Sequence, residues 1–161
     1  SGFVQISQVA PISEDAAALA TTTLAPLGAS EAEATPDLAV RLDTIGRAVL
    51  DDLDFATGSA RLGEAQFGSL QALATYLTQY PDRTVALVGH TDASGSLPAN
   101  IELSKRRAAS VLERLVSDYN VPRSQLEAEG MGYLAPIASN LTEAGRNANR
   151  RVEVIITSTT E

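Results

Sequence analysis

The sequence predicts an α+β domain, a two-layer α/β sandwich in which helices pack on a mixed four-stranded sheet. Three observations predict this class. Apolar residues recur every three or four positions in residues 63–80 and again in residues 100–119, which is the helical period. Residues 84–89 form a near-continuous apolar run of strand length, and residues 150–157 alternate with the strand period. Strands linked through helices cross over right-handed within one sheet, so these elements form one sheet with helices packed on it.

Residues 1–34 predict a linker or tail that precedes the domain. They carry four acids and nine alanines but neither lysine nor arginine, and prolines keep any regular element short. We therefore assign residues 35–161 to the domain. It begins with a short helix, for which Thr35 is the expected cap, Pro36 the first helical residue and Gly46 the stop.

The other elements follow from apolar spacing and from the turn residues between them. Pro81 ends one helix, whereas Asn120 and Pro122 end the next. In order, the sequence predicts a strand at 48–55, a helix at 63–80, a strand at 84–89, a helix at 100–119, a strand at 125–131, a turn or short helix at 142–147 and a last strand at 150–157. After the opening helix, the core therefore has the order βαβαββ.

Composition argues against several classes of function. A net charge of -8 and a pI near 4.6 repel phosphate backbones and anionic lipids, so neither nucleic acid nor a membrane surface is an expected partner. No apolar run approaches the ~20 residues that span a bilayer, so we expect no membrane insertion by this fragment. The chain has no cysteine and a single histidine, His90, for which we expect a hydrogen-bonded structural role. We expect no metal, no cofactor and no catalytic residue, since a serine elbow is also missing.

A binding site is predicted where the second strand ends and the following helix begins. Ligands in α/β units tend to lie beyond the carboxyl ends of strands, and Thr91 and Asp92 occupy that position. On a helical wheel, Arg107 and Asn100 point in nearly the same direction, and the arginine side chain leans back toward the helix start. Leu103 lies on the same side, placed to line an aliphatic stem. The acid and the guanidinium can together hold a ligand that carries both charges.

A simpler interpretation stays open for each of these residues. Asp92 can be a loop residue that bonds nearby backbone N–H groups, and Arg107 an ordinary surface or salt-bridge arginine. A second basic group, Arg146, Arg150 and Arg151, precedes the last strand. We expect these three arginines to pair with the acids around them.

Two long motifs resemble those of a known family, the OmpA-like peptidoglycan-binding domains. GHTD at 89–92, Gly95, Asn100 and LSKRRAASV at 103–111 are similar to its central signature in residue type and spacing. GMGYLAP at 130–136 and GRNANRRVEV at 145–154 are similar to its second signature. The resemblance extends over about residues 48–157.

The resemblance implies a ligand, the free end of meso-diaminopimelate in the peptidoglycan stem peptide. It places Asp92 on the ligand's ammonium and Arg107 on its carboxylate, with Asn100, Thr91 and Leu103 beside them. Phe55 is a further candidate, although Ala56 follows it where many members of the family carry aspartate.

The resemblance also implies a function and a location. We expect a non-enzymatic domain in the periplasm that binds peptidoglycan non-covalently. It would tether an envelope protein, attached to the outer membrane of a Gram-negative bacterium through a part not present here. The alternative is a module of the same fold that binds another envelope protein instead of peptidoglycan.

Overall fold

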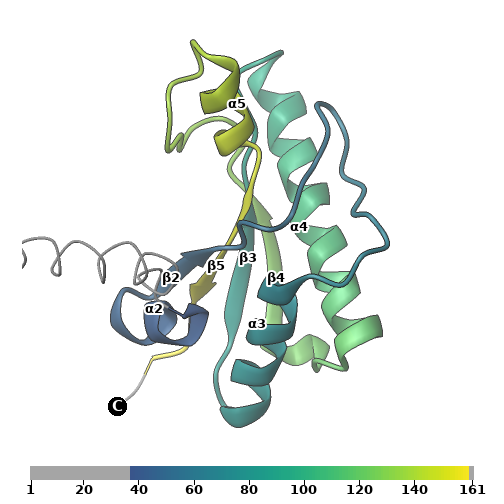
Figure 1. Cartoon of the computed structure of the whole chain (residues 1–161), viewed down its shortest axis with the longest axis vertical. Helices are drawn as coiled ribbons and strands as arrows, with labels where there is room; N and C mark the ends of the chain where they lie inside the picture. Colours follow the sequence, from purple (N-terminus) through teal and green to yellow (C-terminus); the bar gives the residue numbers. More distant parts are fainter. Residues whose placement is uncertain (1–36, 160–161) are drawn as a thin grey trace, which may run out of the picture. The chain divides into compact units, whose positions relative to one another are not determined.

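The computed structural model describes residues 37–159, and the predicted tail and the cap at Thr35 lie outside them. The described elements are, in chain order, α2 (Leu38–Thr44), β2 (Arg47–Val49), α3 (Gly68–Gln79), β3 (Val85–Gly89), α4 (Leu97–Tyr119), the 3-10 turn η2 (Arg123–Gln125), β4 (Leu126–Gly130), α5 (Glu143–Asn149) and β5 (Val152–Ile156). Figure 1 shows α3 and α4 along the sheet, and α5 near the end where α4 begins.

The four strands form one mixed sheet in the order β2-β5-β3-β4. The last strand, β5, is inserted between β2 and β3 and runs antiparallel to both, whereas β3 and β4 are parallel. This confirms the predicted α+β class, the mixed four-stranded sheet and the packing of helices on it. Because β3 lies between β5 and β4, all five of its residues are buried, which explains its continuous apolar sequence.

An aliphatic core fills the space between the sheet and the helices. Most of its buried side chains are Leu, Val and Ala, with Phe55 and Tyr76 as the two aromatic members. The inner stripe of α4 includes Ala108, Val111 and Leu115, all fully buried. The sequence spacing predicted that stripe correctly, because residues three and four apart share one face of a helix.

Two glycines bring the beginning of α4 close to the sheet. Gly89 and Gly130 end β3 and β4 and are paired across the two strands. A Cβ atom at Gly89 would overlap the backbone of Ser104, and one at Gly130 would lie 2.5 Å from the backbone nitrogen of Lys105. The absence of these side chains lets α4 lie directly on the strand ends. The loop after β3 is therefore held beside the first turns of α4.

The predicted first strand, residues 48–55, is mostly wrong. Strand β2 ends at Val49, and a turn follows in which the N–H of Leu53 donates to the carbonyl of Leu50. Leu50, Leu53 and Phe55 are buried while the aspartates between them are exposed. Here the apolar side chains of an irregular loop reach the core, so an apolar stretch without the helical period need not be a strand.

Two helices begin at other residues than the sequence predicted. Helix α4 begins at Leu97, three residues before the predicted Asn100, because Ser96 caps it and Pro98 fits its first turn. Helix α3 begins at Gly68 rather than Gly63. Residues 50–67 instead form a long loop that runs past α4 (Figure 1). That loop contributes one wall of the site described next.

Candidate functional site

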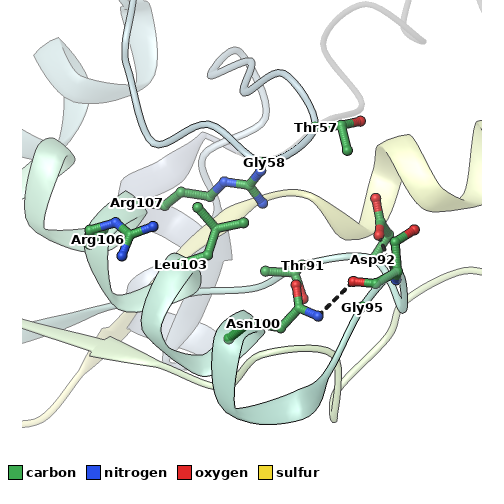
Figure 2. A pocket seen from close by; sticks show the side chains of 11 residues that line it. Thr57, Gly58, Thr91, Asp92, Gly95, Asn100, Leu103, Arg106 and Arg107 are labelled. Atoms are coloured by element: carbon green, nitrogen blue, oxygen red, sulfur yellow. Dashed lines mark hydrogen bonds between the residues drawn. The ribbon is translucent and has the colours of Figure 1, made fainter.

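A cavity of about 270 Å³ opens between the end of β3, the first turns of α4 and the loop after β2. Figure 2 shows Leu103 and Arg107 on one side of it and Asp92 on the other, with Asn100 between them near the floor. Five of the six predicted binding residues line this cavity, namely Thr91, Asp92, Asn100, Leu103 and Arg107. The sixth, Phe55, lies in the core.

Arg107 is a buried cation without a carboxylate partner. Arg107 is only 1% exposed, and it forms no ion pair within residues 37–159. Its Nε donates to the carbonyl of Ser59 at 2.8 Å, and its two terminal nitrogens donate to the carbonyls of His90 and Ala56, each at 3.1 Å. A guanidinium has five N–H groups, so two remain for another acceptor. The interpretation of Arg107 as a surface or salt-bridge arginine is wrong.

The surroundings of Arg107 make its charge costly. Burial lowers the pKa of Arg107 to about 10, and the nearby positive charge of Arg150 adds to that effect. The ring of Phe55 lies 5.2 Å from the guanidinium carbon, which favours the cation. Phe55 therefore supports Arg107 and does not line the cavity. An anion that entered the cavity would relieve the remaining desolvation cost.

Asp92 is bound by an arginine from the far end of the chain. One carboxylate oxygen accepts a hydrogen bond from the N–H of Ser94 at 2.9 Å, and the other lies 2.6 Å from the guanidinium of Arg150. Side chains 92 and 150 are only 6% and 8% exposed. Burial raises the pKa of Asp92, but the hydrogen bonds from Ser94 and Arg150 outweigh it and hold the pKa below the usual value. Asp92 is therefore ionised at neutral pH.

Asn100 fixes the loop that carries Asp92. Its amide nitrogen donates to the carbonyls of Ser94 and Ser96, at 2.7 and 2.9 Å. Gly95, between them, has a φ of +89°, a conformation that favours glycine. Asn100 thus holds the loop against the start of α4. The helical wheel predicted its direction but not this role.

Thr91 and Leu103 complete the lining. The hydroxyl of Thr91 is buried and has no partner in the described part of the chain, while its backbone N–H donates to the carbonyl of Gly132. Leu103 is half-buried and faces the cavity between Arg107 and Asn100 (Figure 2). The walls thus offer a cation, an anion, a hydroxyl and an apolar surface.

The second basic group pairs with acids as expected. Arg146 contacts Glu143 at 2.9 Å, and Arg151 contacts Glu153. Arg150 contacts both Asp92 and Glu143. The sequence interpretation missed that Arg150 reaches the candidate site itself, because its partner Asp92 lies 58 positions away. The second family-like motif, which contains Arg150, was the only signal that pointed toward it.

His90 does not have the hydrogen-bonded role predicted for it. Its side chain is buried, yet neither ring nitrogen has a hydrogen-bond partner within residues 37–159. The nearest carboxylate is that of Glu153, 3.8 Å from Nε2. Burial lowers the pKa of His90 to about 4, and the charge of Arg151 adds to that effect. His90 is therefore neutral at pH 7, and its backbone carbonyl, rather than its ring, serves Arg107.

Within the described residues, no group of three or more His, Cys, Asp or Glu side chains is arranged to hold a metal ion. The helices of residues 37–159 include none with both the length and the apolar character needed to span a membrane.

Comparison with known proteins identifies the family of this fold and site. A model of the OmpA family matches residues 54–150, more than half of the chain. Outer membrane porin F of Pseudomonas aeruginosa is 37% identical over 102 residues, which cover 63% of this chain and 29% of the porin. The peptidoglycan-binding protein ArfA of Mycobacterium tuberculosis is 39% identical over 106 residues, which cover 63% of this chain and 31% of ArfA. The chain thus spans about a third or less of these relatives.

Among solved structures, the peptidoglycan-associated lipoprotein from Burkholderia pseudomallei superimposes with a TM-score of 0.60 at 30% identity. The superposition covers 65% of this chain and 88% of the lipoprotein.

Proposed function

Because this chain belongs to the OmpA family, we propose that it binds peptidoglycan non-covalently through the free end of meso-diaminopimelate in the stem peptide. That end carries a carboxylate and an ammonium on one carbon, joined to an aliphatic stem. Relatives named for peptidoglycan binding or association support the polymer as partner. The cavity chemistry supports the choice of diaminopimelate.

The observation that carries this proposal is the buried, unpaired charge of Arg107 in the same cavity as Asp92. The two free N–H groups of Arg107 suit a carboxylate, which a planar guanidinium binds in a forked arrangement. Asp92 is ionised and takes the ammonium. Leu103 lines the path of the aliphatic stem. A ligand without the carboxylate would leave Arg107 without a partner of opposite charge.

Arg150 sets a condition on binding, because it already occupies one oxygen of Asp92. The ligand's ammonium must share the carboxylate with Arg150 or displace it. Displacement is feasible, since Arg150 also contacts Glu143 and the side-chain oxygen of Asn147, each at 3.2 Å. The charge on Arg150 would remain paired after it left Asp92.

The domain would act in the periplasm as a tether between the cell wall and an envelope component, without chemistry on its ligand. The name of the porin relative supports an outer-membrane association. If the Asp92–Arg150 pair is only structural, the same fold would bind another envelope protein instead. That pair is the observation which favours this second candidate.

Co-sedimentation with isolated sacculi tests the proposal, and Asp92→Asn is the variant of choice. It keeps the shape of the side chain but removes its charge, whereas changing Arg107 would also break three bonds that hold the loop after β2. We expect the affinity of Asp92→Asn for sacculi to fall about tenfold or more, as for loss of a charged hydrogen bond. Asp82→Asn removes an exposed carboxylate that does not line the cavity, and this variant should sediment like the wild type.

Two further measurements make the co-sedimentation result decisive. An unchanged amide spectrum outside the site must show that Asp92→Asn is folded, and added free diaminopimelate must release the wild type from sacculi. A folded Asp92→Asn protein that sediments normally, together with no release by diaminopimelate, would support the protein-binding module instead.

A further inference from the structure

A shallow groove of about 630 Å³ runs along α4 from the rim of the diaminopimelate cavity. Arg106 borders both the cavity and the groove, so the two hollows meet at that residue. The loop after β2 forms the other wall, and two hydrogen bonds fix it there. Ser110 donates to the carbonyl of Ala60 at 2.7 Å, and Arg114 donates to the carbonyl of Gly63 at 2.8 Å.

The groove carries positive charge that the rest of the described chain does not neutralise. Arg61 and Arg106 are both exposed and form no ion pair within residues 37–159. The other charged groups there are already paired, Arg114 with Asp118 at 3.3 Å and Glu113 with Arg123 at 2.7 Å. In a protein of net charge -8, two unpaired arginines beside an anion-binding cavity are a local exception.

We infer that this groove binds the residue that precedes diaminopimelate in the stem peptide, with Arg106 holding its free carboxylate; the inference rests on the proposed function. That residue is D-glutamate joined through its γ-carboxyl, so its α-carboxylate is not consumed by the peptide bond. It is attached to the amino group at the opposite end of diaminopimelate from the free end. When the free end enters the cavity, the glutamate remains at the rim.

Charge decides which way the peptide leaves the cavity. Figure 2 shows Asp92 at one side of the cavity and Arg106 at the other, beyond Leu103. Asp92 is already paired with Arg150, whereas Arg106 has no partner of opposite charge within residues 37–159, so a second carboxylate is attracted on the side of Arg106. The apolar stem would pass over Leu103, and the glutamate carboxylate would then meet the exposed guanidinium of Arg106. Arg61, farther along the groove, would attract the same charge more weakly.

The test compares three probes: free meso-diaminopimelate, the tripeptide L-Ala-γ-D-Glu-meso-diaminopimelate, and the same tripeptide with D-isoglutamine, whose α-carboxylate is an amide. Titration calorimetry would measure each probe against the wild type and Arg106→Gln. We expect Arg106→Gln to weaken the glutamate tripeptide about threefold to fivefold more than it weakens free diaminopimelate, the range of an exposed ion pair. The isoglutamine tripeptide should bind both proteins equally.

Lys105→Gln is the matched control, because Lys105 is an exposed cation on the same helix that lines neither hollow. It should leave the affinity for all three probes unchanged. Equal affinities of the wild type for the glutamate and isoglutamine tripeptides would overturn the inference while the proposed function stands. Equal losses in Arg106→Gln and Lys105→Gln would also overturn it, since they would reflect general charge alone. No binding of free diaminopimelate would overturn the proposed function and this inference together.

Discussion

At the scale of single residues, the site depends on charged groups that the fold has removed from water. Arg107 and Asp92 are each almost fully buried, but only Asp92 has a partner of opposite charge within residues 37–159. An unpaired buried cation costs stability, so the fold retains Arg107 at a penalty that an anionic ligand would relieve. Three backbone carbonyls reduce that penalty without neutralising the charge.

His90 gives a residue-scale prediction about pH. Its pKa is about 4 in the folded protein and 6.5 when exposed, so the unfolded chain binds the proton first. Stability from the neutral ring is complete above pH 6.5 and is lost as the pH falls from 6.5 to 4. At pH 5 the loss should be about 2 kcal/mol relative to pH 7.5. Beyond the effect of burial, the charges of Arg151 and Arg47 lower the pKa of the ring further, whereas that of Glu153 raises it.

Urea denaturation of wild type and His90→Gln at the two pH values would measure this contribution. The variant keeps a neutral side chain and cannot take up the proton, so the other titrating groups cancel in the comparison. We expect the wild type to lose about 2 kcal/mol more than the variant between pH 7.5 and 5. Equal losses in the two proteins would show that His90 does not carry the effect.

Sequence reasoning at this scale succeeded where helix geometry decides the outcome. The wheel placed Arg107 on the side of Asn100, and the structure finds Arg107 buried at the cavity while its sequence neighbour Arg106 is exposed. It failed where the partner comes from a distant element. The pairing of Asp92 with Arg150 depends on how α5 lies relative to the loop after β3, and no local spacing encodes that arrangement.

At the scale of elements, the position of α4 on β3 and β4 determines the geometry of the site. The paired glycines at positions 89 and 130 let the helix backbone touch the strand ends, which aligns Asn100, Leu103 and Arg107 with the loop that carries Asp92. A larger residue at either glycine would push α4 away from the sheet. Both the stability of the fold and the shape of the cavity depend on that contact.

Gly130→Ala tests this contact. The added Cβ would lie about 2.5 Å from the backbone nitrogen of Lys105 and 2.6 Å from the carbonyl oxygen of Ile101. Backbone atoms cannot move aside cheaply, so we expect a loss of roughly 1–3 kcal/mol in the free energy of unfolding. Gly63→Ala is the control, because a Cβ there has nothing within 4 Å. Denaturant unfolding of both variants would measure the difference, and similar stabilities would contradict a close helix–sheet contact at Gly130.

The sequence predicted the helices and the inner strands better than the first strand. Continuous or periodic apolar spacing identified α4, β3 and β5, since each is long enough for its period to stand out. The strand prediction for residues 48–55 relied on the lack of helix-spaced apolar residues, and a loop whose leucines reach the core lacks that spacing too. The distinction requires knowledge of which neighbours pair with the backbone.

At the scale of the whole molecule, an acidic protein carries a local cluster of positive charge beside its candidate site. A chain of net charge -8 concentrates Arg107 and Arg150 at one end of its sheet, with Arg61 and Arg106 along the adjacent groove. The acidic remainder disfavours nucleic acids and anionic membranes, whereas a small ligand with paired charges can be admitted locally.

The measurement that tests the central claim most directly is a titration of the wild-type domain with free meso-diaminopimelate, followed by amide and arginine side-chain NMR signals. We predict saturable shifts confined to residues 91–95, to residues 100–107 and to the Nε signal of Arg107, with 1,5-diaminopentane, which keeps the stem and both ammonium groups but has no carboxylate, producing no saturable shifts at the same concentrations. Shifts that do not saturate, or equal responses to diaminopimelate and 1,5-diaminopentane, would contradict a site in which Arg107 binds the carboxylate and Asp92 the ammonium.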